Sequence, residues 1–104
     1  MRELPIACDM TALNAAQRER QQALMKSFHD LIEETQETDD GYAFRLAADA
    51  STILFAAEFI TIERLCCPFF HFALEAGPAD APLWLRVSGR EGVKEFIKME
   101  LGLG

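Results

Sequence analysis

Basic residues are scarce in this chain, and their scarcity narrows the range of partners. Only 10 Lys and Arg stand against 17 Asp and Glu, which gives a formal charge of −7 at pH 7 over 104 residues. Binding to phosphate requires clustered basic side chains, and those present are dispersed along the sequence. We therefore expect no nucleic-acid partner and no binding to anionic membrane surfaces.

Long apolar runs are also lacking. The longest, Ile53 to Ile62, is interrupted by Glu58 and is too short to span a bilayer. The N-terminus shows no basic stretch followed by an apolar one, as a secretory signal would. These absences predict a cytoplasmic protein.

Cysteine is rare as well, and the number of cysteines is odd. There are 3, and two of them, Cys66 and Cys67, are adjacent. A disulfide framework uses an even number of cysteines at separated positions. The pattern therefore favours reduced thiols over a disulfide-stapled fold.

Half of the residues are apolar, which is enough for one small core. We expect a single domain over residues 1–104. Residues 1–10 are predicted to form an extended lead-in, and the acidic stretch Glu33–Gly41 a solvated loop. The predicted elements, in order, are a helix from Asp9 or Thr11 to about Thr35, a strand Tyr42–Ala47, a helix from Asp49 or Ser51 to the adjacent cysteines, strands Phe69–Glu75 and Leu83–Val87, and a helix that begins within Ser88–Glu91.

This order, α-β-α-β-β-α, predicts a two-layer α+β fold whose three-stranded sheet is covered on one face by helices. A crossover connection would make the first two strands parallel, with the third inserted between them. The uncovered face would show Arg45, Phe69, His71, Glu75, Trp84 and Arg86. That face is either solvated or an interface, and together with the very apolar second helix it leads us to expect a homodimer.

The stretch Glu63–Phe72 concentrates the reactive side chains. Pro68 obstructs a helix, so Cys66 and Cys67 should lie at the end of one. Glu63 precedes them by three and four residues, the spacing that brings side chains onto one helix face. One carboxylate and two thiols are therefore predicted to converge.

If Cys8 packs against this helix end, three thiols form a set of soft donors. Such a set suits Cu(I), zinc or heavier thiophilic ions such as mercury and arsenic. Glu63 or His71 would complete the site, with Arg64 as a further accessory residue. The predicted function is thus non-catalytic binding of a soft metal or metalloid ion.

Two other interpretations remain open. Free cysteines are often buried, so Cys66 and Cys67 could be core packing in a structural dimer. Alternatively, a Glu, two Cys and a His in close sequence are similar to the sites of alkylhydroperoxidase-like thiol enzymes. Those enzymes place two residues between their cysteines, whereas this pair is adjacent.

The segment Glu-Arg-Leu-Cys-Cys-Pro-Phe-Phe, residues 63–70, also carries a family resemblance. It resembles a family of small bacterial proteins of uncharacterised activity, together with the segments Ile6–Cys8, Asp40–Arg45, Leu83–Leu85 and Gly92–Phe96. It is also similar to segments at the C-terminal end of regulators of the mercury-resistance type. The resemblance implies thiol chemistry with soft metals, and Cys8, Glu63, Cys66 and Cys67 are the matching positions.

Overall fold

The computed structural model describes residues 5–103, which form an α+β fold. The class is confirmed, but the antiparallel sheet has four strands where three were predicted. The part of the predicted lead-in that falls on residues 1–4 lies outside the described residues. In chain order the elements are the 3-10 helix η1 (Met10–Ala12), α1 (Ala15–Leu31), β1 (Glu34–Glu37), β2 (Gly41–Leu46), α2 (Ala50–Cys66), β3 (His71–Ala76), β4 (Leu83–Ser88) and α3 (Val93–Glu100).

The additional strand, β1, comes from the acidic stretch that was predicted to be a loop. It pairs antiparallel with β2, and Glu34 lies opposite Arg45. The Arg45 Nη1 atom is 2.9 Å from Oε1 of Glu34, an ion pair that links the two strands. Because β1 is a sheet edge with mostly exposed side chains, it has no apolar alternation that would predict it.

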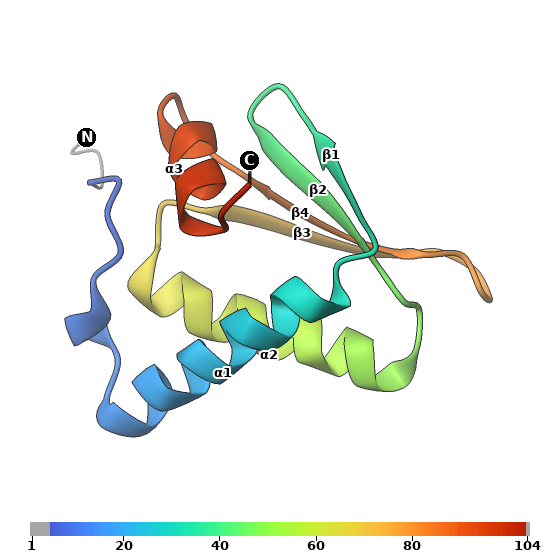
Figure 1. The fold of residues 1–104 in the computed structure, drawn as a ribbon, viewed down its shortest axis with the longest axis horizontal. Helices are drawn as coiled ribbons and strands as arrows, with labels where there is room; N and C mark the ends of the chain where they lie inside the picture. Colours follow the sequence, from blue (N-terminus) through green and yellow to red (C-terminus); the bar gives the residue numbers. More distant parts are fainter. Residues whose placement is uncertain (1–4, 104) are drawn as a thin grey trace.

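The sheet order is β1-β2-β4-β3, so the last strand in the chain lies between two earlier ones (Figure 1). Both β2 and β3 are antiparallel to β4, and therefore run parallel to each other. This arrangement confirms the predicted insertion of the third strand between the first two.

Side-chain caps determine where the helices begin. The Asp49 side chain accepts a hydrogen bond of 2.8 Å from the Thr52 backbone N–H, as predicted for the start of α2. At α1 the cap is Asn14, which forms a capping box with Gln17. Asp9, one of the two predicted caps for that helix, caps the preceding η1 instead. The first long helix therefore begins later than predicted, and it ends at Leu31 before the predicted Thr35.

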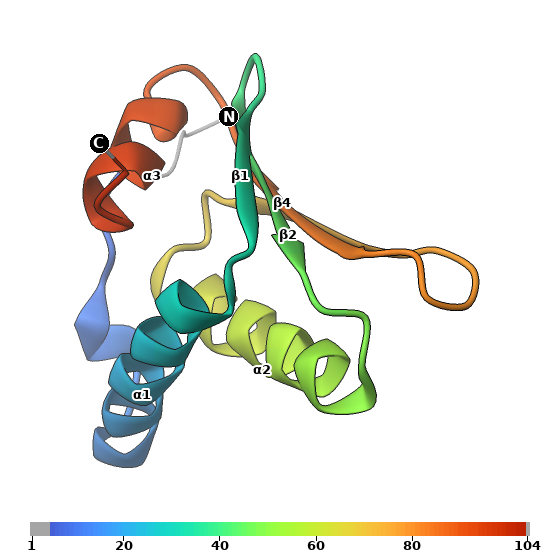
Figure 2. The ribbon, with the colours of Figure 1, turned by 45° about the vertical axis from the view of Figure 1, so that its right-hand side comes forward.

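The helices lie on one side of the sheet and enclose the core (Figure 2). Along β4, Leu83, Leu85 and Val87 are buried, whereas Trp84 is half-buried and Arg86 is exposed. Phe28 of α1 is fully buried, and its ring centroid lies 4.6 Å from that of Phe59 on α2 and 5.2 Å from that of Phe44 on β2. One aromatic side chain thus joins both long helices to the sheet.

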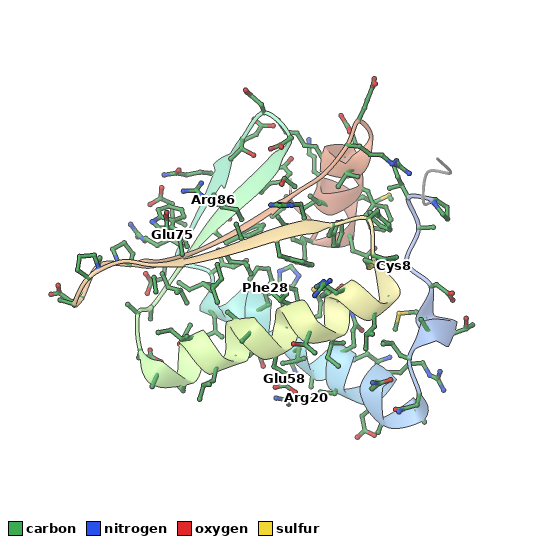
Figure 3. All side chains as sticks on the ribbon, turned by 180° about the vertical axis from the view of Figure 1, so that it is seen from behind. Cys8, Arg20, Phe28, Glu58, Glu75 and Arg86 are labelled. Carbon is green, nitrogen blue, oxygen red and sulfur yellow. A yellow bond between two sulfur atoms is a disulfide. The ribbon has the colours of Figure 1, made fainter. Side chains whose placement is uncertain are left out.

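The other sheet face carries cross-strand ion pairs. The Arg86 and Glu75 side chains, from β4 and β3, approach to 3.5 Å (Figure 3). Phe69 is not on this face, contrary to the prediction, because it precedes β3 and packs edge-on against Phe96 of α3 at 5.3 Å. Without Phe69, the face holds less apolar surface than the sequence indicated.

Some apolar side chains remain exposed on the helices. Leu54 and Leu65 of α2 are 71% and 44% exposed, and Met99 of α3 is 72% exposed. Self-association through such residues stays a prediction. Among residues 5–103, none of the helices combines the length and the apolar character needed to cross a membrane.

We expect Phe28→Ala to lower the free energy of unfolding by about 3–5 kcal/mol, because it leaves a cavity between α1, α2 and the sheet. Leu54→Ala, at an exposed position of α2, should change it by no more than about 0.5 kcal/mol. Urea unfolding followed by circular dichroism measures both values. Equal effects of the two substitutions would contradict the central position of Phe28.

Candidate functional site

The N-terminal segment meets the C-terminal end of α2 (Figures 1 and 3). The backbone N–H of Asp9 donates a hydrogen bond of 2.8 Å to the carbonyl oxygen of Cys66. The last carbonyl groups of a helix have no partner within that helix, so this bond satisfies one of them. It also places the neighbouring Cys8 beside the two adjacent cysteines.

The sulfur atoms of all 3 cysteines in the sequence gather at this point. Cys8 and Cys67, 59 residues apart, form a disulfide, and the Cys66 sulfur lies 3.7 Å from that of Cys67. The three sulfur atoms all lie within 4.8 Å of one another. The predicted approach of Cys8 is confirmed, whereas the expectation of three reduced thiols is wrong for Cys8 and Cys67 in this structure.

The end of α2 explains how adjacent cysteines come to share one site. The Cys67 N–H donates to the carbonyl of Glu63 at 2.7 Å, which completes the final helical turn. Pro68 follows, and the Phe70 N–H then donates to the Cys67 carbonyl at 3.2 Å, which turns the chain away from the helix. The strand therefore begins at His71, two residues later than predicted.

Glu63 lies on the same helix face as both cysteines, as its spacing predicted. Its Oε2 atom is 3.5 Å from the Cys67 sulfur and 3.8 Å from the Cys66 sulfur. Its Oε1 atom accepts a hydrogen bond of 3.1 Å from Nε2 of Gln21 on α1. Residue Glu63 is only 3% exposed. One of its carboxyl oxygens is held by the Gln21 amide, and the other faces the two sulfur atoms.

Burial dominates the acid–base properties of the site. It raises the pKa of Glu63, an effect that the Gln21 hydrogen bond opposes and the charge of Glu100 reinforces. Burial, followed by the charge of Glu63, also raises the pKa of the Cys66 thiol to about 11. At neutral pH Cys66 is consequently a thiol of low nucleophilicity.

The two accessory residues predicted from the sequence lie elsewhere. His71 is exposed at the first position of β3, paired across the sheet with Ser88. Arg64 is exposed on the last turn of α2. Neither belongs to the group of closely spaced sulfur atoms.

Two residues near the site were not predicted, Gln21 and Glu100. Gln21 belongs to the polar run Gln17–Gln22, whose composition is typical of a solvated helix face. Glu100 lies in the last turn of α3. A helical period gives a signal for both: Gln21 precedes the buried Leu24 by three residues, and Glu100 follows the buried Ile97 by three. The spacing predicts which face they lie on, but not the contact with Glu63.

In its reduced form the cluster offers three sulfur donors with a carboxylate oxygen beside two of them. Two thiolates bound to one tetrahedral zinc ion lie about 3.8 Å apart, given zinc–sulfur bonds of about 2.3 Å. The Cys66 and Cys67 sulfur atoms, at 3.7 Å, already have this separation. The donor set is therefore suited to a soft ion.

The chain matches no protein-family model, no curated protein and no solved structure. The family resemblance seen in the sequence thus stays a prediction. The functional inference rests on the geometry of Cys8, Cys66, Cys67 and Glu63.

In the oxidised protein we expect the disulfide to join Cys8 to Cys67 and the buried Cys66 to resist alkylation until the chain unfolds. Non-reducing mass spectrometry should show the disulfide in Cys66→Ser but not in Cys67→Ser. Because the bond joins residues separated by 59 positions, its reduction should lower the free energy of unfolding by about 4 kcal/mol. Rapid labelling of Cys66 in the folded protein would contradict this assignment.

The raised pKa of Glu63 predicts a pH-dependent stability difference. Folded protein holds this proton to a higher pH than the unfolded chain does, so Glu63 costs stability as pH rises above its ordinary pKa of 4.5. Glu63→Gln has no titrating proton at this position, so the variant does not lose this stability. The free energy of unfolding of the variant minus that of the parent should therefore become more positive as pH rises from about 4.5 to about 8.

Urea unfolding of the disulfide-bonded parent and variant across this pH range measures the difference. Glu19→Gln, at an exposed position of α1, is the control for losing a surface carboxylate. A Glu63→Gln difference that does not change with pH would contradict the prediction.

Proposed function

We propose that the reduced protein binds a thiophilic metal or metalloid ion through Cys8, Cys66 and Cys67, with Glu63 beside the thiols. The observation that carries this proposal is the approach of three sulfur atoms to within 4.8 Å of one another, although Cys8 and Cys67 are 59 residues apart. Thiolates are the ligands that soft ions prefer. Holding a Cu(I), zinc, mercury or arsenic ion is a non-catalytic function, because the protein supplies ligands and converts no substrate.

The end of α2 overcomes the usual difficulty of chelation by adjacent cysteines. Cys66 is the last helical residue and Cys67 has left the helix, with φ −126° and ψ 67°. The change of backbone direction leaves their sulfur atoms 3.7 Å apart. A third donor, Cys8, arrives on a separate segment that is hydrogen-bonded to the helix end.

Glu63 and Gln21 add an outer layer to this donor set. Residues that hydrogen-bond to a ligand or to its neighbour fix its orientation. Gln21 holds one carboxyl oxygen of Glu63 at 3.1 Å, and the other oxygen faces the sulfur atoms. This oxygen is available as a fourth donor for an ion that takes four ligands.

The disulfide gives binding a redox requirement. A sulfur atom in the Cys8–Cys67 bond is not a thiolate, so a reductant must open the bond before an ion can take all three cysteines. Conversely, a bound ion would occupy the same sulfur atoms and oppose their oxidation.

The alternative functions, a thiol oxidoreductase or a structural dimer with buried cysteines, explain fewer of the observed features of the cysteine cluster than ion binding does. A thiol oxidoreductase requires a reactive thiolate, but burial and Glu63 raise the pKa of Cys66 to about 11. Core packing accounts for the full burial of Cys66 but not for a buried carboxyl group that faces two sulfur atoms. A homodimer formed through the exposed Leu54 and Leu65 is compatible with ion binding, since one chain contains the whole cluster.

The reduced parent should bind one equivalent of at least one of Cu(I), zinc, Hg(II) or arsenite, and the oxidised parent none or far less. Cys66→Ser combined with Cys67→Ser should abolish binding, because it removes two of three sulfur donors, and Cys8→Ser should weaken binding by less. Native mass spectrometry gives the stoichiometry, and circular dichroism checks the fold.

Should the double variant unfold, Cys66→Ala and Cys67→Ala tested singly keep the comparison possible. A folded double variant that binds these ions as tightly as the parent would refute the proposal. So would a reduced parent that binds none of them.

A further inference from the structure

The sulfur atom of Cys66 lies among oxygen atoms. It is 3.9 Å from the carbonyl oxygen of Ile62, 3.8 Å from that of Glu63 and 3.8 Å from Oε2 of the Glu63 side chain. These carbonyl groups belong to the last turns of α2, where the helix dipole is negative. The electrostatic field at the sulfur atoms therefore disfavours any additional negative charge.

A second carboxyl group strengthens this field. Glu100 and Glu63 line the same small apolar pocket, which is also walled by Phe59, Phe70 and Leu101. The charged side chains that act on Cys66 are these two glutamates. Arg64, the basic residue of the adjacent helix turn, is exposed. Among residues 5–103, the charged side chains whose field raises the pKa of the Cys66 thiol are both acidic.

In this negative field, the net charge of the complex determines which class of ion the three thiolates bind best. Three thiolates leave two negative charges on a Cu(I) complex, one on a zinc complex and none on a complex of a trivalent ion. A net charge placed in a buried apolar environment without a counter-ion is costly. Here Cys66 and Cys67 are both fully buried, and their charged neighbours are acidic.

From this arrangement we infer that the three cysteines bind a trivalent metalloid, of the arsenite or antimonite kind, as a neutral trithiolate. The inference rests on the proposed function, and it names the class of ion for the same site. Three donors match three charges, so the complex needs no fourth ligand and no counter-ion. Glu63 would remain beside the complex without bonding to the metalloid.

The ligand exchange balances without an oxidant or a reductant once the disulfide has been reduced. Three As–O bonds of arsenous acid break and three As–S bonds form. Each thiol proton leaves with one hydroxide as water, so the reaction releases three waters and no net protons. Arsenic stays trivalent throughout. A zinc or copper cation, by contrast, must displace protons from the thiols.

Hg(II) is the informative comparison because it also forms a neutral complex, but with two thiolates. It would leave one cysteine unused. Removing any single cysteine should consequently affect the two ions differently: arsenite loses a required donor, whereas Hg(II) retains a pair.

The test uses the reduced 104-residue protein with arsenite, zinc, Cu(I) and Hg(II) as probes. Competition titrations should show arsenite retained against equimolar zinc and Cu(I), and native mass spectrometry should show one arsenic replacing three protons.

Cys8→Ser should weaken arsenite binding at least about tenfold, while changing Hg(II) binding much less. Calorimetry in two buffers of different ionisation enthalpy should show no net proton release with arsenite.

Glu63→Gln tests whether the Glu63 carboxylate bonds to the bound ion or only lies beside it. It should leave arsenite affinity within about threefold of the parent, whereas zinc, which would use this carboxylate, should bind about 10–100-fold more weakly. Displacement of arsenite by zinc or Cu(I), or unchanged arsenite binding in Cys8→Ser, would overturn the trivalent assignment and leave the proposed function intact. If none of the four probes binds, the proposed function itself fails.

Discussion

The abrupt end of α2 is the constraint on which the site depends. A helix that stops leaves its final carbonyl groups without partners, and here two other segments supply them. Asp9 donates its N–H to the Cys66 carbonyl, and Phe70 donates to that of Cys67. The first bond brings the N-terminal segment to the cysteines, and the second starts the turn toward β3. A single backbone requirement thus assembles the cluster and directs the chain into the sheet.

The same helix contributes to the core through its apolar residues. Phe59 of α2 stacks against Phe28 of α1 at 4.6 Å, and Ile62 is buried one turn before Cys66. Glu63 lies next to these apolar side chains, and its burial follows from its position on the packed face of the helix. Packing of the fold and electrostatics of the site are therefore linked: the contacts that secure α2 also desolvate the carboxyl group and the thiol.

Much of this arrangement could be predicted from residue pattern. Pro68 correctly indicated the end of the helix, and the spacing of Glu63 to the cysteines correctly indicated their convergence. The insertion of β4 between β2 and β3 also followed from strand order. These features are local, or they follow from general rules of chain connection.

The features that could not be predicted depend on tertiary contacts or on oxidation state. β1 is a polar edge strand held by pairing with β2, so its own sequence carries no strand period. The sequence around Gln21 is typical of a solvated helix face, and its hydrogen bond to Glu63 arises only from the packing of α1 beside α2. An odd number of cysteines does not exclude one disulfide with one free thiol, because burial can protect the remaining residue, as it does for Cys66.

The disulfide divides the chain in a way that the sheet does not. Its ring, residues 8–67, contains α1, β1, β2 and α2, whereas β4, which completes the sheet between β2 and β3, lies outside it. During synthesis a ribosome therefore releases every cysteine before it releases the strand that closes the sheet. The growing chain already carries Cys8, Cys66 and Cys67 while β2 has only β1 as a neighbour, so the disulfide can form before the sheet is complete.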